Sequence, residues 1–457
     1  MATDENSPKK PLPLSKLVMH LTTSAIMFGN ISFGCSGVAF APALGNMAET
    51  YKTTIADIAI VFTIVSMTTC IGAIICGFLS KYVNRQLIVI ISLFAMALSM
   101  FMTPHCPTKM LFFVCGGVFG LSAGFYGLSQ VVWIIEIWQQ KAGPFIQAQH
   151  FCLSFGSILP SAVLAPFLKK YEPSHPITAE PVLTEESSIH IPFLIIGTLN
   201  SLAFLFQLFL FIFYRYHTPP MYADENVQQL DDAKDGSHST AKTELSENVS
   251  SKQQELATVK VKRGISSRKI QLFAFAILFL SAYQAMETST MQFLPIFGQY
   301  SDLKLSQSVA AHVLTGLMAM YATGRLAGIV LIFKVRPELI IAVNLLLVTM
   351  GNTILSVWAS GSMSMFWIGS MMVGAGFSTL FPSFYTFIEK HLIISSIFAS
   401  STMLFGATAS AVYPIILGKF IEQQAVVLTY SNFASTSVCA IVMFWGYYLA
   451  RTTVARE

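Results

Sequence analysis

Charged residues are scarce in this chain. Asp, Glu, Lys and Arg make up 11% of its 457 residues, and 54% of the chain is hydrophobic, whereas about a quarter of a typical soluble protein is charged. We therefore predict an integral membrane protein whose apolar surface packs as a helix bundle in a lipid bilayer. The net charge of +4 lies in the segments between apolar runs, so it points to orientation in a membrane and not to nucleic-acid binding.

Sequence signatures of catalysis are also missing. The chain has no Walker sequence, Gly-rich dinucleotide turn, zinc-ligand spacing or nucleophile elbow. Its seven cysteines fall almost entirely inside apolar runs, where Cys acts as a small hydrophobe, so we expect neither a disulfide framework nor a metal site. We predict that the protein is not an enzyme and has no cofactor, and that any energy source is a gradient of Na⁺ or H⁺.

Twelve apolar segments are long enough to cross the hydrocarbon core, which takes about 20 helical residues. The first six lie at 17–41, 58–80, 86–103, 111–136, 145–168 and 191–214. The second six lie at 270–297, 309–333, 338–358, 364–388, 392–418 and 425–450. This pattern predicts an all-α membrane protein with twelve transmembrane helices.

Polar stretches divide the chain into five parts. The segment 215–269 carries nine Lys and Arg against eight Asp and Glu, so we predict a disordered linker. The predicted parts are an N-terminal segment (1–16), an N-terminal six-helix half (17–214), the linker (215–269), a C-terminal six-helix half (270–450) and a tail (451–457).

The two halves repeat one another weakly. Residues 124–138 and 151–168 resemble 376–391 and 404–417, in both cases at an offset of about 250 residues. A parallel repeat of this kind is typical of a transporter built from two pseudo-symmetric halves.

The Lys and Arg residues predict the orientation. Outside the apolar runs, twenty of them lie on the side that carries both termini and the linker, and six lie on the opposite side. Cytoplasmic segments of membrane proteins are enriched in these residues. We therefore expect both termini and the linker to be cytoplasmic, and we expect a multi-pass monomer in the plasma membrane.

Glu287 lies inside the predicted helix 270–297. An ionised group at the bilayer centre costs on the order of 3 kcal/mol, so such a residue usually faces a protein-lined or watery cavity. Gln284, Glu287 and Met291 share one helix face by their spacing, and Pro295 follows this polar zone, where a proline can break a helix near its outer end. We predict that Gln284 and Glu287 bind substrate and that Glu287 also couples an ion. A structural, protonated Glu287 is the alternative.

Further candidates lie in both halves. Gln147 and His150 share a face of the predicted helix 145–168 and supply neutral donors and acceptors suited to a polyhydroxylated solute. Asn30 and Trp133 are additional substrate-binding candidates, the Trp as a platform for a sugar ring.

Arg325 and Glu389 lie at a common depth in the C-terminal half. We predict that they form a gating or structural ion pair, because either charge alone is costly in a membrane. Glu136, near the end of the predicted helix 111–136, is a further charge within an apolar segment. For Glu136 and Glu389, the alternative to a functional role is contact of the carboxylate with lipid headgroups.

Several motifs resemble a known family. The segment 138–160, WQQKAGPFIQAQHFCLSFGSILP, is similar to the W-x-x-x-A-G-P-x-x-Q-A-x-H-F stretch of the sodium-dependent glucose transporter 1 type, the domain-containing protein 4 group of the major facilitator superfamily. YQAME (283–287) and FPSFYTFIEKH (381–391) also resemble that family. Two segments depart from it: 77–86 has Lys81 where the superfamily usually has an acid, and 126–131 has no Asp.

The resemblance implies twelve helices around a central cavity between pseudo-symmetric halves, and facilitated or sodium-coupled uptake of a sugar such as glucose. We expect a carrier that works by alternating access. Two alternatives remain open. The substrate could be a small organic acid, or the protein could be a membrane receptor or scaffold that does not transport.

Overall fold

The computed structural model describes residues 16–80, 82–171, 183–185, 188–215, 267–390 and 396–454. Most of the predicted linker 215–269 lies outside these residues, as do the first 15 residues and the last three.

The N-terminal half contains the first six predicted transmembrane segments. Their helices are α1 (Lys16–Val38), α2 (Phe40–Thr50), α3 (Ile55–Ile58), α4 (Ile60–Leu79), α5 (Arg85–Met102), α6 (Lys109–Trp138), α7 (Ala142–Gly156), α8 (Leu159–Leu164) and α9 (His190–Phe213). Short 3₁₀ turns η1 (Thr103–His105), η2 (Gln139–Lys141) and η3 (Ala165–Phe167) join them, and β1 (Lys170–Tyr171) pairs antiparallel with β2 (Leu183–Glu185) before α9.

The C-terminal half contains the second six segments. Its helices are α12 (Ser267–Tyr300), α13 (Gln307–Lys334), α14 (Pro337–Val357), α15 (Met363–Phe377), α16 (Leu380–Glu389), α17 (Ser396–Phe420) and α18 (Val427–Val454). In the described part of the chain, eleven helical stretches are long and apolar enough to cross a membrane, and α17 contains a shorter apolar stretch, Leu404–Phe420. The predicted all-α architecture of twelve helices is confirmed.

Several helices start where the sequence provides a cap. Thr54, Asn84, Thr108, Ser306 and Ser362 each accept a hydrogen bond from a backbone N–H in the first turn that follows them. Such caps satisfy donors that have no partner within the helix, and each typically contributes about 1 kcal/mol. The short polar loops between apolar runs therefore fix where the helices begin.

Some predicted boundaries were wrong. The first segment continues to Thr50, with a break at Ala39, and the tenth is interrupted between Phe377 and Leu380. Pro295 does not break its helix, because α12 continues through it to Tyr300. A proline removes only one backbone donor, and packing against neighbouring helices tolerates that loss in a membrane.

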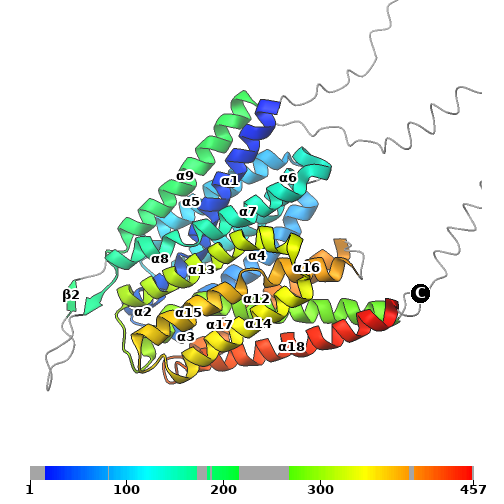
Figure 1. The fold of residues 1–457 in the computed structure, drawn as a ribbon. Helices are drawn as coiled ribbons and strands as arrows, with labels where there is room; N and C mark the ends of the chain where they lie inside the picture. Colours follow the sequence, from blue (N-terminus) through cyan, green and yellow to red (C-terminus); the bar gives the residue numbers. More distant parts are fainter. Residues whose placement is uncertain are drawn as a thin grey trace, which may run out of the picture.

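Figure 1 shows how the halves are arranged. The helices of the N-terminal half, coloured blue to green, and those of the C-terminal half, yellow-green to red, approach each other near β2. They diverge toward the opposite end, where α1 begins and α18 ends. We call the end where α1 begins and α18 ends the terminal end of the bundle, and the end near β2 the far end.

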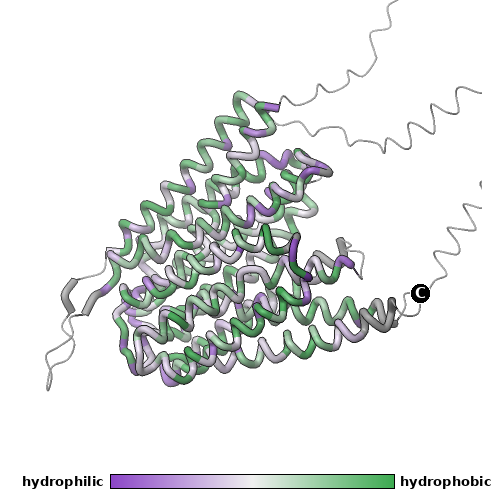
Figure 2. Tube along the Cα trace, in the orientation of Figure 1, coloured by the Kyte–Doolittle hydropathy of each residue, from purple (hydrophilic) through white to green (hydrophobic). Residues whose placement is uncertain are grey.

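Hydropathy follows the same axis. In Figure 2 the helices are mostly apolar along their length, and hydrophilic residues gather at the helix ends. Many large apolar side chains point outward, among them Phe78, Phe213 and Phe444, which are at least 65% exposed. An exterior of this kind suits lipid and not water.

Glycines shape the most extensive helix contact within the N-terminal half, between α4 and α6. A Cβ at Gly72 would collide with the backbone carbonyl of Leu121, and one at Gly124 with that of Thr69. Small residues at helix crossings let backbones approach, and such packing is a main source of stability in lipid.

Candidate functional site: a cavity between the two halves

A cavity of about 1440 Å³ lies between the halves. The N-terminal half contributes α1 and α7, and the C-terminal half contributes α12, α13, α16, the turn before α16, and one residue each from α14 and α17. Gly143 at the start of α7 and Glu389 at the end of α16 mark its extent toward the terminal end. The polar and charged residues lining it include Gln147, His150, Ser154, Tyr283, Gln284, Glu287, Thr288, Tyr321, Arg325, Thr379, Tyr385, Glu389 and Thr402.

Hydrogen bonds between the halves close the far end. Gln307 at the start of α13 donates to Glu49 at the end of α2 (2.8 Å), and the Ser308 hydroxyl donates to the Ala165 carbonyl (2.6 Å). On the other side of the interface, the backbone N–H of Ile55 donates to Glu422 (2.9 Å). The structure is therefore a conformation sealed at the far end.

Four side chains form a cluster in the wall that the C-terminal half contributes. Tyr283 and Glu287 are one turn apart on α12, and Tyr321 and Arg325 are one turn apart on α13. The hydroxyl of Tyr321 donates to Glu287 Oε1 (2.7 Å), and the hydroxyl of Tyr283 lies 2.5 Å from the same oxygen and 3.0 Å from the Phe377 carbonyl. Glu287 is thus held by two phenols.

Arg325 connects this cluster to the other half. Its guanidinium Nη2 donates to the Tyr321 hydroxyl, and its Cζ lies 4.4 Å from the centre of the Tyr321 ring. Its Nη1 lies 3.5 Å from the backbone carbonyl of His150 on α7. Its Nε is buried and has no hydrogen-bond partner among the described residues.

The structure brings four predicted site residues to one cavity. Gln147 and His150 line it from α7, and Gln284 and Glu287 line it from α12. These residues come from the two halves and meet only through the tertiary fold. Their roles in substrate binding, and that of Glu287 in ion coupling, remain predictions.

Asn30 and Trp133 do not belong to this cavity. Asn30 is buried between α1 and α6, where its amide donates to Gln130 Oε1 (2.9 Å), and Gln149 of α7 donates to the same oxygen. Trp133 is completely buried in the core of the N-terminal half. Neither side chain lines the cavity, so this conformation gives no support to their predicted role in substrate binding.

The predicted Arg325–Glu389 ion pair is absent from the described part of the structure. Both residues line the cavity, but Glu389 is exposed at the end of α16, whereas Arg325 is held by Tyr321. The prediction relied on the similar depth of Arg325 and Glu389 in the membrane, but the two side chains have different surroundings.

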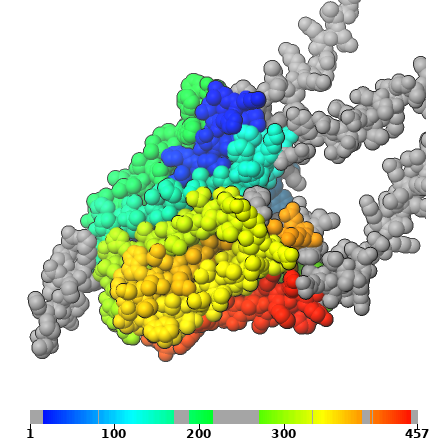
Figure 3. All heavy atoms as spheres, in the orientation of Figure 1, coloured from blue at the N-terminus to red at the C-terminus, as the bar shows by residue number. Residues whose placement is uncertain are grey.

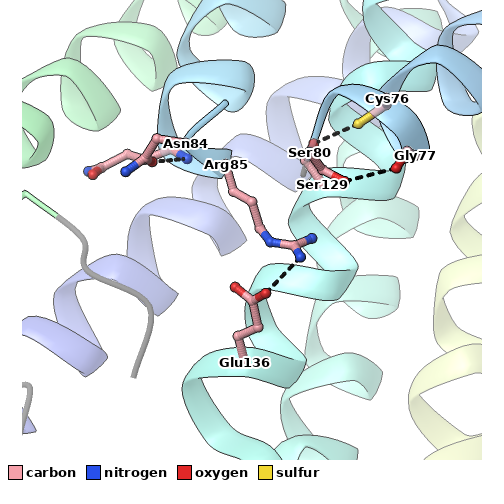
Figure 4. A network of polar contacts seen from close by, with 8 residues as sticks. Cys76, Gly77, Ser80, Asn84, Arg85, Ser129 and Glu136 are labelled. Atoms are coloured by element: carbon pink, nitrogen blue, oxygen red, sulfur yellow. Dashed lines mark hydrogen bonds and ion pairs between the residues drawn. The ribbon is translucent and has the colours of Figure 1, made fainter. Parts of the chain in front are cut away.

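Glu136, by contrast, forms an ion pair. Figure 4 shows Arg85, at the start of α5, reaching Glu136 of α6 at 2.7 Å. Nearby, Cys76 and Ser129 lie 3.1 Å apart between α4 and α6. The Glu136 carboxylate thus contacts Arg85 of a neighbouring helix. The alternative prediction was a contact with lipid headgroups.

Sequence reasoning missed Tyr321 as part of the site. Its spacing of four residues from Arg325 puts both on one helix face, and Tyr283 stands in the same relation to Glu287. Two Tyr–charge pairs at this spacing in consecutive helices were a usable signal.

Comparisons with known proteins decide the family. The family model for the Major Facilitator Superfamily matches residues 26–414. The chain belongs to the major facilitator superfamily. It is 23% identical to the sodium-dependent glucose transporter 1 of Xenopus laevis, with 90% of this chain and 78% of the relative covered.

Two further matches agree. The chain is 20% identical to the major facilitator superfamily domain-containing protein 4A of Xenopus tropicalis, covering 86% of this chain and 84% of the relative. The crystal structure of the nucleoside transporter NupG matches with a TM-score of 0.59 at 15% identity, covering 93% of this chain and 98% of NupG. The predicted family resemblance is confirmed, and the protein is a multi-pass membrane transporter of this superfamily.

Proposed function

We propose that this superfamily member is a carrier for a neutral, polyhydroxylated solute such as a sugar, and that it works by alternating access. The observation that carries the proposal is the cavity between the halves, which is closed at the far end and lined from both halves by hydrogen-bonding side chains. The name of the Xenopus laevis relative supports a sugar as substrate.

The chemistry of the cavity fits such a solute. Gln147 and Gln284 offer both donors and acceptors, and Thr288 and Tyr385 offer hydroxyls. Aromatic and aliphatic side chains such as Phe33, Phe381 and Met291 line the rest. A mostly apolar cavity with a few convergent polar groups is typical of sites that bind small molecules.

Glu287 is the residue to which we assign ion coupling. A buried carboxylate in a transporter is a common proton or cation site. Its Oε1 is already occupied by two phenol groups, and Arg325 contacts one of those phenols. The nearby guanidinium stabilises the ionised carboxylate and so opposes both protonation and Na⁺ binding, and the proposal keeps H⁺ and Na⁺ as the two candidate coupling ions.

A carrier for a small organic acid is the second candidate. The buried Nε of Arg325, which has no partner among the described residues, favours it. A carboxylate substrate would bond this donor through a charge-assisted hydrogen bond.

Uptake by the purified protein in proteoliposomes tests the proposal. Radiolabelled hexoses, nucleosides and monocarboxylates would be compared under an imposed Na⁺ gradient, an imposed H⁺ gradient and neither. Saturable hexose uptake that unlabelled hexose inhibits supports the proposal, and saturable uptake of only the monocarboxylate supports the second candidate. Specific binding without uptake of any solute would favour the receptor or scaffold alternative.

The orientation has its own test. We propose that the terminal end is cytoplasmic, on the basis of the distribution of Lys and Arg. A Ser246→Cys variant should react with a membrane-impermeant maleimide only after cells are permeabilised. Reaction in intact cells would reverse the proposed orientation. Labelling of the parent protein, whose seven cysteines are mostly buried, gives the background.

A further inference from the structure

A second, smaller cavity lies outside the central one. It is a groove of about 470 Å³ between α1 and α7, with walls formed by one face of α1 from His20 to Ile31 and by Phe145 and Ala148 of α7. In Figure 3 this part of α1, coloured blue, lies at the surface between α9 in green and α7 in cyan. The groove therefore opens on the side of the bundle that faces lipid.

Polarity changes along the groove. Its end nearest the terminal end has His20, Thr23 and Ser24, and the deeper part has Met27, Phe28 and Ile31. At ~1.5 Å per residue, His20 and Ile31 are separated by roughly 16 Å along α1, about half the ~30 Å hydrocarbon core. The groove thus runs from the level of the headgroups toward the bilayer midplane. Its length matches that of one leaflet.

Two basic residues lie at the polar end. Lys16 precedes His20 by one turn of α1, and Lys141 lies one turn before Phe145. Both lysines are exposed. Lys16 shares a face of α1 with His20, because residues four apart on a helix are neighbours, and Lys141 is the residue just before α7, the helix that carries Phe145 and Ala148. Both lysines therefore lie at the headgroup end of the helices that form the groove. Basic sites between membrane helices on the cytoplasmic side bind anionic headgroups.

Aromatic side chains fix one wall of the groove. Trp138 stacks on Phe145 with ring centres 3.8 Å apart, and its indole N–H donates to the Thr23 hydroxyl (2.9 Å). The His20 ring also contacts Trp138 in a tilted arrangement, with ring centres 5.1 Å apart. The hydroxyl of Ser24 is exposed in the groove and makes no hydrogen bond with the other described residues. The wall is thus preformed, and a polar group is left for a ligand.

We propose that this groove binds one anionic phospholipid from the leaflet at the terminal end. The headgroup lies between Lys16 and Lys141, and Ser24 bonds an ester oxygen. One acyl chain lies along Met27, Phe28 and Ile31. A fully apolar ligand would leave the lysines and Ser24 unused, and a soluble anion would leave the deep apolar part empty.

The groove also touches the helix that lines the central cavity. Ala148 contributes to both cavities, and it lies between Gln147 and Gln149 on α7. Binding of lipid therefore acts on the packing of α7 against α1. The proposal rests on the groove alone and holds whether or not the central cavity carries a sugar.

Native mass spectrometry of the full-length protein tests the proposal. The protein would be stripped of lipid in detergent and titrated with phosphatidylserine or phosphatidylcholine as probes. We expect one phosphatidylserine to be retained more tightly than phosphatidylcholine. The double variant Lys16→Gln/Lys141→Gln should weaken that binding by about 25-fold, since each basic residue near an anionic headgroup contributes roughly fivefold.

The matched control is Lys334→Gln/Arg336→Gln, which removes two exposed positive charges at the same end of the C-terminal half. It should change binding less than about twofold, on the same fivefold scale per direct contact. A second variant, Ser24→Phe, fills the groove and should weaken both lipids without changing charge. Equal affinity for the two lipids, or equal losses in the test and control variants, would overturn the proposal.

Discussion

The two walls of the central cavity carry different kinds of polar group. The wall from α7 offers neutral side chains, Gln147 and His150, whereas the wall from α12 and α13 offers Glu287 and Arg325 with two phenols between them. A neutral wall can recognise hydroxyl groups, but only the charged wall can respond to an ion. We infer that both walls take part in recognition, since Gln284 of α12 also lines the cavity, and that ion coupling belongs to the wall of the C-terminal half.

The core of each half, in contrast, is alike. In the N-terminal half, Asn200 of α9 bonds Ser32 and Ser36 of α1, at 2.7 and 2.5 Å. In the C-terminal half, Asn432 of α18 bonds Thr290 of α12 (2.9 Å). The same amide-to-hydroxyl contact therefore joins the first and last helix of each half. The two halves therefore differ in the side chains that line the cavity, and they share a polar contact within their own helix packing.

The largest effect is expected at the charged wall. Glu287→Gln keeps the shape of the side chain and removes its charge, so concentrative uptake should fall about 5- to 150-fold, the usual range for a coupling between two sites. Solute exchange between equal concentrations should persist. Uptake would be measured in proteoliposomes with and without an imposed ion gradient.

Glu389→Gln is the matched control, since it makes the same chemical change at the exposed end of α16. It should leave gradient-driven uptake close to that of the parent protein. If Glu287→Gln retains full dependence on the gradient and unchanged apparent affinity, Glu287 has only a structural role and the assignment of ion coupling to the wall of the C-terminal half fails.

The next largest effect concerns the charges within this wall. Arg325→Ala leaves Glu287 without the nearby positive charge, and the thermal stability should fall because an isolated buried charge is costly. The double variant Arg325→Ala/Glu287→Gln should lose less stability than the sum of the single changes, by about 0.5–3 kcal/mol. Thermal unfolding in detergent measures all three. Strict additivity would show that the two charges do not interact.

The neutral wall should give a smaller effect. Gln147→Ala removes one hydrogen-bonding group, which contributes about 1 kcal/mol, so the apparent affinity for solute should weaken about fivefold with the maximal rate retained. Concentration dependence of uptake measures both quantities. Ion dependence should be unchanged, and its loss would place coupling on this wall as well.

The smallest effect on transport is expected at Asn30. This residue supports the contact of α1 with α6 through Gln130 and does not reach the cavity. Asn30→Ala should lower the stability to unfolding by about 1 kcal/mol, because Gln130 Oε1 loses one donor and keeps Gln149, while the apparent affinity stays near that of the parent. A large loss of affinity without a loss of stability would return Asn30 to the substrate site.

Much of the fold could be read from the sequence. Twelve apolar runs, separated by charges, are enough to predict twelve helices, because a membrane leaves the backbone no other way to satisfy its hydrogen bonds over that length. The break at Ala39 and the passage of α12 through Pro295 escaped this reasoning. Both depend on how neighbouring helices pack, and neither changes the apolar pattern.

The sequence by itself determined that Glu287 is a buried acid within a membrane helix and that Gln147 and His150 lie on one face of another. Only the tertiary structure decided which faces look into the cavity. It placed Asn30 and Trp133 in the core and gave Glu287 a partner from a different helix, Tyr321, whose hydroxyl also accepts a hydrogen bond from Arg325. The physical reason is that lipid and protein interior are both apolar, so hydropathy cannot tell which side of a membrane helix faces lipid, core or cavity.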